Sequence, residues 1–224
     1  MDQRGIVEIG ADLVQEVLRH RLRHPEVIRL VVREVAMPPP DTETLMQVMV
    51  PEVNQEVLER LKDHSDGKQT YFSIACSGDT GAGKSFLLRA LLKHFDAEGV
   101  PFSSDSLEAC KMSITGNVTC FVHKFILVFD MEGPKGTLPL MEVIPPEHTG
   151  PFKLDVSDPD HQRREKLRQE AVAKYFPPLA VAISNTMMYV TKTNPVKNHE
   201  TALHIKQLAE NCLKVSTTDS AAKG

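Results

Sequence analysis

The sequence predicts an α/β fold in which helices lie on both faces of a central sheet, so that the domain has three layers. Residues Tyr71–Leu92 begin as a short apolar run, break into a glycine-rich turn and continue as a helix. Two later stretches, 117–122 and 125–129, are dominated by β-branched and aromatic residues, which favour strands. Amphipathic helical patterns occur before and after these stretches, and strands that alternate with helices are typical of this class.

The first 40 residues are predicted to form an N-terminal helical extension. Apolar residues recur at helical spacing between Ala11 and Arg23. The apolar run Val27–Val35 is too short for its periodicity to distinguish a strand from a second helix. Three consecutive prolines, Pro38–Pro40, form a stiff connector that no helix can cross. We therefore place a boundary here, with the main domain at residues 41–224. The apolar positions of the first helix are Leu13, Val14, Val17, Leu18 and Leu22.

The segment after the prolines is expected to contain a strand at Leu45–Val50 and a helix at Pro51–Leu61, with its proline in the first turn. Turn residues at Ser65–Gly67 end that helix and lead to the apolar run that begins at Tyr71. Farther along, residues Asp96–Met112 are rich in Gly, Pro, Ser and Asp and are predicted to form a loop.

The glycine-rich turn fits the pattern G-x-x-x-x-G-K-[ST] at every fixed position, and a predicted strand and helix flank it as that pattern requires. Its glycines allow backbone angles at which successive N–H groups turn inward and bind an anion. The helix that begins near Lys84 directs its free N–H groups at the same anion. We therefore predict a phosphate-binding loop, in which Lys84 reaches the β- and γ-phosphates and the Ser85 hydroxyl holds Mg²⁺. The predicted nucleotide-contacting residues are Gly78, Asp79, Thr80, Gly81, Ala82, Gly83, Lys84, Ser85 and Phe86. In the helix that follows, the expected buried stripe consists of Phe86, Leu87, Leu88, Leu91 and Leu92.

The stretches 117–122 and 125–129 are separated by two residues, a link short enough for an antiparallel hairpin. The second is apolar throughout, as expected of a strand buried on both faces, and Asp130-Met131-Glu132-Gly133 follows it. An acid at the carboxyl end of such a strand, on the same sheet edge as a phosphate-binding loop, fixes Mg²⁺ or its water shell. We predict this role for Asp130, and we expect Gly133 to leave room for a backbone N–H near the γ-phosphate. The simpler alternative is an Asp-initiated turn.

The remainder of the chain is expected to add an irregular segment, two helices and a strand. Residues Pro134–Asp160 are rich in Pro and Gly and are predicted to be irregular. The charged stretch His161–Tyr175 predicts a helix, and Pro177-Pro178 is expected to end it. Residues Leu179–Val190 predict a buried strand, with a break near Ser184-Asn185, and Glu200–Val215 predict a last amphipathic helix.

Composition limits the classes of function. The formal net charge of -4 leaves no basic excess to neutralise phosphates, so we expect no nucleic-acid partner. No run of about twenty uncharged apolar residues occurs, so we expect no transmembrane segment. The four cysteines show neither C-x-x-C pairing nor metal-ligand spacing, which favours a reducing compartment and a cytoplasmic location.

In combination, three segments resemble the large GTPases of the guanylate-binding protein and atlastin family, in the dynamin superfamily. Val53–Leu61 resembles the short helix that precedes the first strand of their G domain. Phe129–Gly133 is similar to their D-x-[EQ]-G second-switch motif. Phe176–Tyr189 resembles their fourth strand, and the likeness extends from about Pro51 to Val215.

The resemblance implies a G domain that binds GTP with Mg²⁺, hydrolyses it to GDP and phosphate, and forms a homodimer across the nucleotide face. It also implies a switch-one hydroxyl that completes the magnesium shell, and this hydroxyl belongs to either Thr115 or Ser113. With Thr115 in that place, the implied metal ligands are Ser85, Thr115 and Asp130. The implied catalytic residues are Lys84, Ser85, Thr115, Asp130 and Gly133.

The sequence departs from the family pattern at two places. Family loops usually carry an arginine at the position of Gly81, and such an arginine finger contributes about 10³ to 10⁵ in rate. Without it, we expect slow hydrolysis or an arginine supplied by a partner. The family's base-recognition pair follows a fifth strand, and this G domain is expected to be incomplete at its C-terminal end, before that strand. Thr191-Lys192-Thr193-Asn194, loosely similar to the N-K-x-D motif of small GTPases, is the alternative base-reading turn.

Two other functions are compatible with the same residues. One is a nucleotide-binding interaction module with little turnover, which the missing arginine favours. The other is a P-loop protein that uses ATP, because the preference for guanine rests on the resemblance alone.

Overall fold

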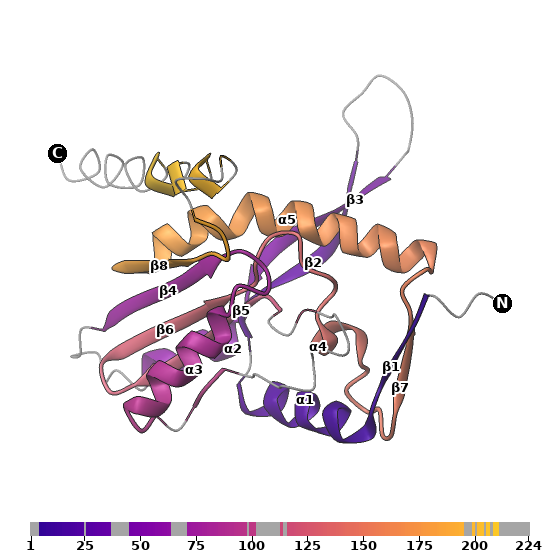
Figure 1. Ribbon diagram of the computed structural model, residues 1–224, viewed down its shortest axis with the longest axis horizontal. Coiled ribbons are helices and arrows are strands. Elements are labelled where there is room, and N and C mark those ends of the chain that lie inside the picture. Colours follow the sequence, from indigo (N-terminus) through magenta and orange to yellow (C-terminus); the bar gives the residue numbers. More distant parts are fainter. Residues whose placement is uncertain are drawn as a thin grey trace.

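The computed structural model has an α/β fold built around a six-stranded mixed sheet (Figure 1). This confirms the predicted α/β class, and the finer prediction of a P-loop, G-domain-like fold stays a prediction. The residues that the structure describes are 5–24, 26–36, 45–63, 71–97, 99–101, 113, 116–194, 199, 201–203, 205–206 and 208–210.

The six strands are arranged in the order β3-β2-β5-β6-β4-β8. Their bounds are Glu26–Ala36 for β2, Leu45–Val53 for β3, Phe72–Gly78 for β4, Val118–His123 for β5, Ile126–Met131 for β6 and Thr186–Val190 for β8. β4 pairs in parallel with both β6 and β8, whereas the pairs among β3, β2, β5 and β6 are antiparallel. Because β4, β6 and β8 run in one direction, their carboxyl ends meet at the same edge of the sheet.

Helices cover both faces of this sheet (Figure 1). Successive residues of a strand point to opposite faces. In β4, Ala75 belongs to the core cluster that includes α5 (Pro159–Ile183), whereas Cys76 packs with Leu88 of α3 (Lys84–His94). The helices α5 and α3 therefore lie on opposite faces. A short helix, α2 (Gln55–Asp63), packs against β2.

A second hydrophobic cluster lies at one end of the molecule. The two-stranded sheet formed by β1 (Ile6–Ile9) and β7 (Phe152–Asp155) is antiparallel, and α1 (Ala11–Arg23) packs there with α4 (Leu140–Val143). The predicted helix at 11–23 is thus confirmed. Its buried side chains are Leu13, Val14, Val17 and Leu18, while Leu22 in the last turn is exposed.

The run 27–35 belongs to strand β2, which settles the choice that its sequence left open. It pairs with β3 on one side and β5 on the other, so tertiary pairing decides its conformation. β3 includes the predicted strand at 45–50, and β5 and β6 form the predicted hairpin. The connector Pro38–Pro40 lies outside the described residues. Division of the chain at residue 40 stays a prediction, although β2 and β3 pair across that point.

The prediction of a helix beginning at Pro51 is wrong, because β3 continues to Val53 and α2 begins at Gln55. Among the described strands, β3 is at the edge of the sheet and pairs with β2 alone, and a proline without an N–H is tolerated at such an edge. Asn54 marks the change of conformation: its side-chain oxygen accepts a hydrogen bond from the Val57 N–H at 3.4 Å, as a helix N-cap does.

The prediction that Pro177-Pro178 ends a helix is also wrong. α5 continues through both prolines to Ile183, so only Thr186–Val190 of the predicted strand is a strand. Prolines inside a helix remove backbone hydrogen bonds and cost about 3 kcal/mol each. Phe176 and Ala180, on either side of the pair, are fully buried in the main core, and this packing stabilises the helix against that cost.

Four smaller expectations concern the segment 134–160, the buried stripe of α3, the last helix and the loop at 96–112. The segment 134–160 is less irregular than predicted, because it contains α4 and β7. In α3, Leu88 and Leu92 are buried as expected, but Phe86 and Leu87 are exposed and lie outside the stripe. The described residues between 199 and 210 are helical, whereas 211–215 and most of the predicted loop at 96–112 lie outside the described part of the chain.

Two cysteines can be placed. Cys76 is buried and Cys120 is half-buried, both as free thiols, and burial raises the pKa of each to about 12. They therefore behave as small apolar residues. The other two cysteines lie outside the described residues.

Candidate functional site

The candidate site lies where β4 ends, at the turn formed by residues 78–83. This turn joins the carboxyl end of β4 to the first residue of α3. Gly78, Gly81 and Gly83 have φ values of 132°, 68° and 90°, which L side chains rarely adopt. At Gly78 a Cβ would lie 2.0 Å from the carbonyl oxygen of Val190, so glycine also allows β8 to approach the turn closely.

The Lys84 side chain is buried under this turn, with only 5% of its surface exposed. Its Nζ donates hydrogen bonds to the carbonyl oxygens of Gly78, at 3.1 Å, and Asp79, at 2.9 Å. Burial lowers the pKa of Lys84, while the nearby charge of Asp130 opposes that shift. The Lys84 ammonium group therefore lies inside the turn, and the charge of Asp130 favours its protonated form.

The next residue of α3 contacts the neighbouring strand. The Ser85 hydroxyl donates a hydrogen bond to Asp130 Oδ2 at 2.7 Å, and Asp130 is buried near the carboxyl end of β6. In the parallel register, Asp130 lies beside Cys76 of β4, two residues before the turn. Parallel pairing thus brings together two oxygen-bearing side chains that are 45 residues apart in the chain.

The segment after β6 packs directly on the turn. A Cβ at Gly133 would lie 2.7 Å from Lys84 Nζ and 2.8 Å from both the Gly78 carbonyl oxygen and the Thr80 nitrogen. The Thr80 hydroxyl donates a hydrogen bond to the carbonyl oxygen of Pro134 at 2.5 Å. Glycine at 133 is therefore required for this close approach.

The end of β8 borders the turn on its other side. The Asp79 N–H donates to the carbonyl oxygen of Val190 at 3.0 Å, and the Thr191 hydroxyl donates to Asp79 Oδ2 at 2.6 Å. Lys192 extends over Gly81, where a Cβ would lie 2.8 Å from its Nζ. The stretch 191–194 therefore lies beside the glycine-rich turn.

Most of the site residues predicted from the sequence come together at this sheet edge. Lys84 and Gly133 contact the turn 78–83, and Ser85, next to Lys84 in the chain, contacts Asp130. Phe86 differs, because 67% of its surface is exposed in the first turn of α3. Thr115 lies outside the described residues.

Ser113, the alternative to Thr115, can be placed next to the segment that follows Gly133. Its backbone N–H donates to the Thr137 hydroxyl at 2.7 Å, and its own hydroxyl would lie 2.6 Å from a Cβ at Gly136. Ser113 is therefore held by this segment.

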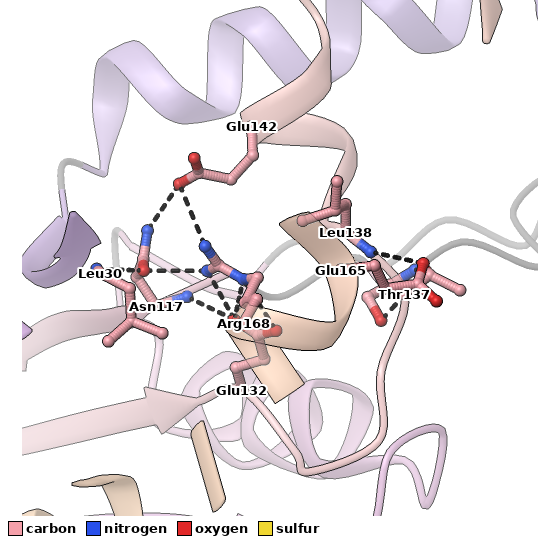
Figure 2. Close-up of polar contacts among 9 residues, drawn as sticks. Leu30, Asn117, Glu132, Thr137, Leu138, Glu142, Glu165 and Arg168 are labelled. Atoms are coloured by element: carbon pink, nitrogen blue, oxygen red, sulfur yellow. Dashed lines mark hydrogen bonds and ion pairs between the residues drawn. The ribbon is translucent and has the colours of Figure 1, made fainter. Parts of the chain in front are cut away.

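A buried ion pair that was not predicted from the sequence involves Glu132, the residue before Gly133 (Figure 2). Arg168 of α5 donates to both carboxylate oxygens of Glu132, with distances of 2.6 to 3.1 Å. Its Nη2 also donates to Asn117 Oδ1 at 2.9 Å. Arg168 and Glu132 are 2% and 4% exposed. One sequence signal could have indicated that Arg168 faces the core, because it stands at helical spacing from the buried Ala171 and Val172, but that signal does not identify Glu132 as its partner.

Burial and ion pairing shift the pKa values of this cluster in opposite directions. Burial raises the pKa of Glu132, and the charge of Arg168 opposes that shift. For Arg168, burial alone would lower the pKa, but Glu132 and then Glu142 raise it. Burial also raises the pKa of Glu26, which hydrogen-bonds Asn117, to about 7.

The described part of the chain contains neither a cluster of metal-binding side chains nor a membrane-spanning helix. Within it, no group of three or more His, Cys, Asp and Glu side chains could hold a metal ion. No helix among the same residues is both long and apolar enough to span a membrane.

Comparison with known proteins assigns no class to this chain. No protein-family model matches the sequence, and no curated protein matches it significantly.

Proposed function

We propose that the chain binds a nucleoside triphosphate at the turn 78–83, in a site of the P-loop type, and hydrolyses it. The observation that carries this proposal is the 2.7 Å contact between Ser85 and Asp130 beside the buried ammonium of Lys84. A glycine-rich turn at a helix N-terminus supplies converging N–H donors for phosphate, and a buried lysine adds a positive charge. A purely structural turn needs neither the lysine nor the acid.

The donor atoms of this pair fit Mg²⁺. Magnesium takes oxygen ligands and is usually bound by one or two carboxylates together with water and substrate phosphates. A hydroxyl and one carboxylate therefore suffice, without a group of several acids. Ser85 and Asp130 are the residues that would hold the ion, which when bound neutralises charge on the phosphates.

GTP is the substrate that we propose, with GDP and phosphate as products. The guanine preference comes from the family resemblance, and the position of Thr191–Asn194 beside the turn supports a base pocket there. Gly81 provides no side-chain cation to the site, which favours slow turnover. An ATP-using protein and a binding module with little turnover are the alternatives to be tested.

The binding test uses fluorescent GTP, GDP and ATP analogues with the full chain in the presence of Mg²⁺. We expect micromolar binding by the wild type and at least a tenfold loss for Lys84→Ala, because the buried ammonium contacts the phosphates. Ser85→Ala is expected to weaken binding only when Mg²⁺ is present. Lys93→Ala, at the exposed far end of α3, serves as the control and should bind normally.

The outcomes separate the alternatives. Failure of the wild type to bind any of the three nucleotides would refute the proposal. Tighter binding of ATP than of GTP would identify an ATP-using protein. Binding without phosphate release in a single-turnover assay would favour the alternative of a nucleotide-binding interaction module. Sedimentation with and without GTP tests the predicted homodimer across the nucleotide face.

A further inference from the structure

The segment 132–138 lies between the glycine-rich turn and α5. On the α5 side, three side chains at i, i+3 and i+4 spacing contact it, so they share one face of the helix. These side chains belong to Glu165, Arg168 and Gln169, and we call them the α5 clamp.

The strongest contact of the clamp is the pair formed by Arg168 and Glu132. The guanidinium contacts both oxygens of the carboxylate, and both side chains are buried. The remaining Glu132 contacts reinforce it, because Glu132 Oε2 also accepts from the Asn117 N–H at 3.1 Å and the Glu132 N–H donates to the Asn117 carbonyl oxygen. Glu132 therefore has one well-defined position, immediately before Gly133.

The other two clamp residues hold the backbone farther along. Gln169 Nε2 donates to the carbonyl oxygen of Gly136 at 3.0 Å. Glu165 Oε2 accepts from the Leu138 N–H at 3.4 Å (Figure 2). The clamp thus contacts the segment at residues 132, 136 and 138.

The opposite side of the same segment contacts the turn. Gly133 lies against Lys84 Nζ, and the carbonyl oxygen of Pro134 accepts a hydrogen bond from Thr80. A lysine of this motif reaches the β- and γ-phosphates. The segment is therefore next to the outer phosphates of a nucleotide bound at the turn, while α5 holds it from behind.

We propose that Arg168 and Gln169 are positioning residues, which set how closely Gly133 and Pro134 approach the outer phosphates and so favour triphosphate over diphosphate. This inference rests on the proposed function. A shift of the segment away from Lys84 weakens contacts to the terminal phosphate more than contacts to the phosphates that the turn itself binds. A merely structural role of the clamp would change binding of both nucleotides equally.

The test compares GTP and GDP affinities of the full chain carrying Gln169→Ala, with Mg²⁺ present. This change removes the bond to the Gly136 carbonyl oxygen and a 3.4 Å bond to Glu165 Oε1, so we expect about a fivefold loss of GTP affinity and less than a twofold loss of GDP affinity. Glu170→Ala, at an exposed neighbouring position, is the matched control and should leave both affinities unchanged. Thermal unfolding of each variant checks that the fold is intact.

A second variant, Arg168→Lys, keeps the charge but loses the two-pronged contact with Glu132. We expect Arg168→Lys to reduce the ratio of GTP affinity to GDP affinity more than Gln169→Ala does. Equal losses of GTP and GDP affinity, or no loss of affinity in either folded variant, would overturn the inference. The proposed function would still stand in that case, provided that the wild type binds nucleotide and Lys84→Ala does not. Absence of binding by the wild type would instead refute the proposed function, and this inference with it.

Discussion

Glu26 is a carboxyl group near one further acid, Glu142, and two bases, Arg168 and Arg21. Two other carboxylates, Glu132 and Glu142, share one guanidinium, that of Arg168. Burial raises the pKa of Glu26 to about 7, whereas hydrogen bonding to Asn117 and the charges of Arg168 and Arg21 oppose the shift. The folded protein therefore binds a proton here at a pH where the unfolded chain has released it.

The sign of the pH dependence follows from that difference. A carboxyl group with a raised pKa in the folded state contributes stability that is complete below its unfolded pKa, near 4.5, and is lost as the pH rises through about 7. We predict that Glu26→Gln, which imitates the protonated form, is more stable than the wild type at pH 8, by about 1 to 3 kcal/mol. Near pH 5 the two should differ little. Urea unfolding between pH 5 and 8 measures this.

The control for this experiment is Glu34→Gln, which changes an exposed carboxyl on the same strand. Its free energy of unfolding should stay within about 0.5 kcal/mol of the wild type at every pH. The prediction would be contradicted if the free energies of unfolding of the wild type and Glu26→Gln changed in parallel between pH 5 and 8.

At the scale of the element, the turn between β4 and α3 depends on glycine in two different ways. Gly78 combines a positive φ with a Cβ position only 2.0 Å from the Val190 carbonyl oxygen. Gly83 also has a positive φ, but a Cβ there would meet no atom within 4 Å. The first position thus carries a steric and a conformational requirement, and the second only the conformational one.

We predict that Gly78→Ala lowers the free energy of unfolding by more than about 3 kcal/mol, because β4 and β8 must separate to admit the methyl group. Gly83→Ala should cost about 1 kcal/mol, the strain of an alanine at positive φ. Urea unfolding of both variants provides the comparison, and similar losses would show that the close approach of Val190 is unimportant.

Helix α5 shows how an element can violate a local rule. Two adjacent prolines favour a helix end, yet α5 continues past them because Phe176 and Ala180 bury their side chains in the main core. The strand that follows is correspondingly short. Just before β8, the side-chain oxygen of Asn185 accepts a hydrogen bond from the Ser73 N–H at 2.8 Å. This bond ties the start of β8 to β4. The end of this helix is therefore set by the sheet on which it packs.

Across the fold as a whole, Asn117 connects helices and strands that are distant in the sequence. Its Oδ1 accepts from the Leu30 N–H of β2 at 2.7 Å and from Arg168 of α5, and its Nδ2 donates to Glu142 of α4 at 2.7 Å. Asn117 is fully buried and has a φ of 58°, a conformation that asparagine tolerates better than most residues. The main sheet, α4 and α5 all meet at this one amide.

We predict that Asn117→Ala costs about 3 to 5 kcal/mol, because several buried groups lose their hydrogen-bond partner at once. Asn117→Gly relieves the backbone strain but should remain similarly destabilised. Asn185→Ala, in an exposed contact, should cost about 1 kcal/mol. Chemical unfolding of the three variants measures this, and equal losses for Asn117→Ala and Asn185→Ala would contradict the central role of Asn117.

Prediction from the sequence succeeded where spacing along the chain carries the information. Helix α1, the β5–β6 hairpin and the connection from β4 to α3 follow from periodicity and from glycine chemistry. Prediction failed where distant residues decide the outcome. Arg168 meets Glu132 across 36 residues and Asn117 across 51, and no local pattern records such a pairing.

Four features can be predicted from the amino-acid sequence alone: the glycine-rich turn, the lysine and the serine that follow it, and an acid at the end of a later apolar strand. Backbone freedom at glycine and the alternation of apolar residues are local properties, so they can be read directly. Three other features depend on contacts in the folded chain: β2 is a strand, α5 continues through its prolines, and Arg168 holds Glu132. Burial and pairing between distant segments determine these features, and their free energy exists only once the chain has folded.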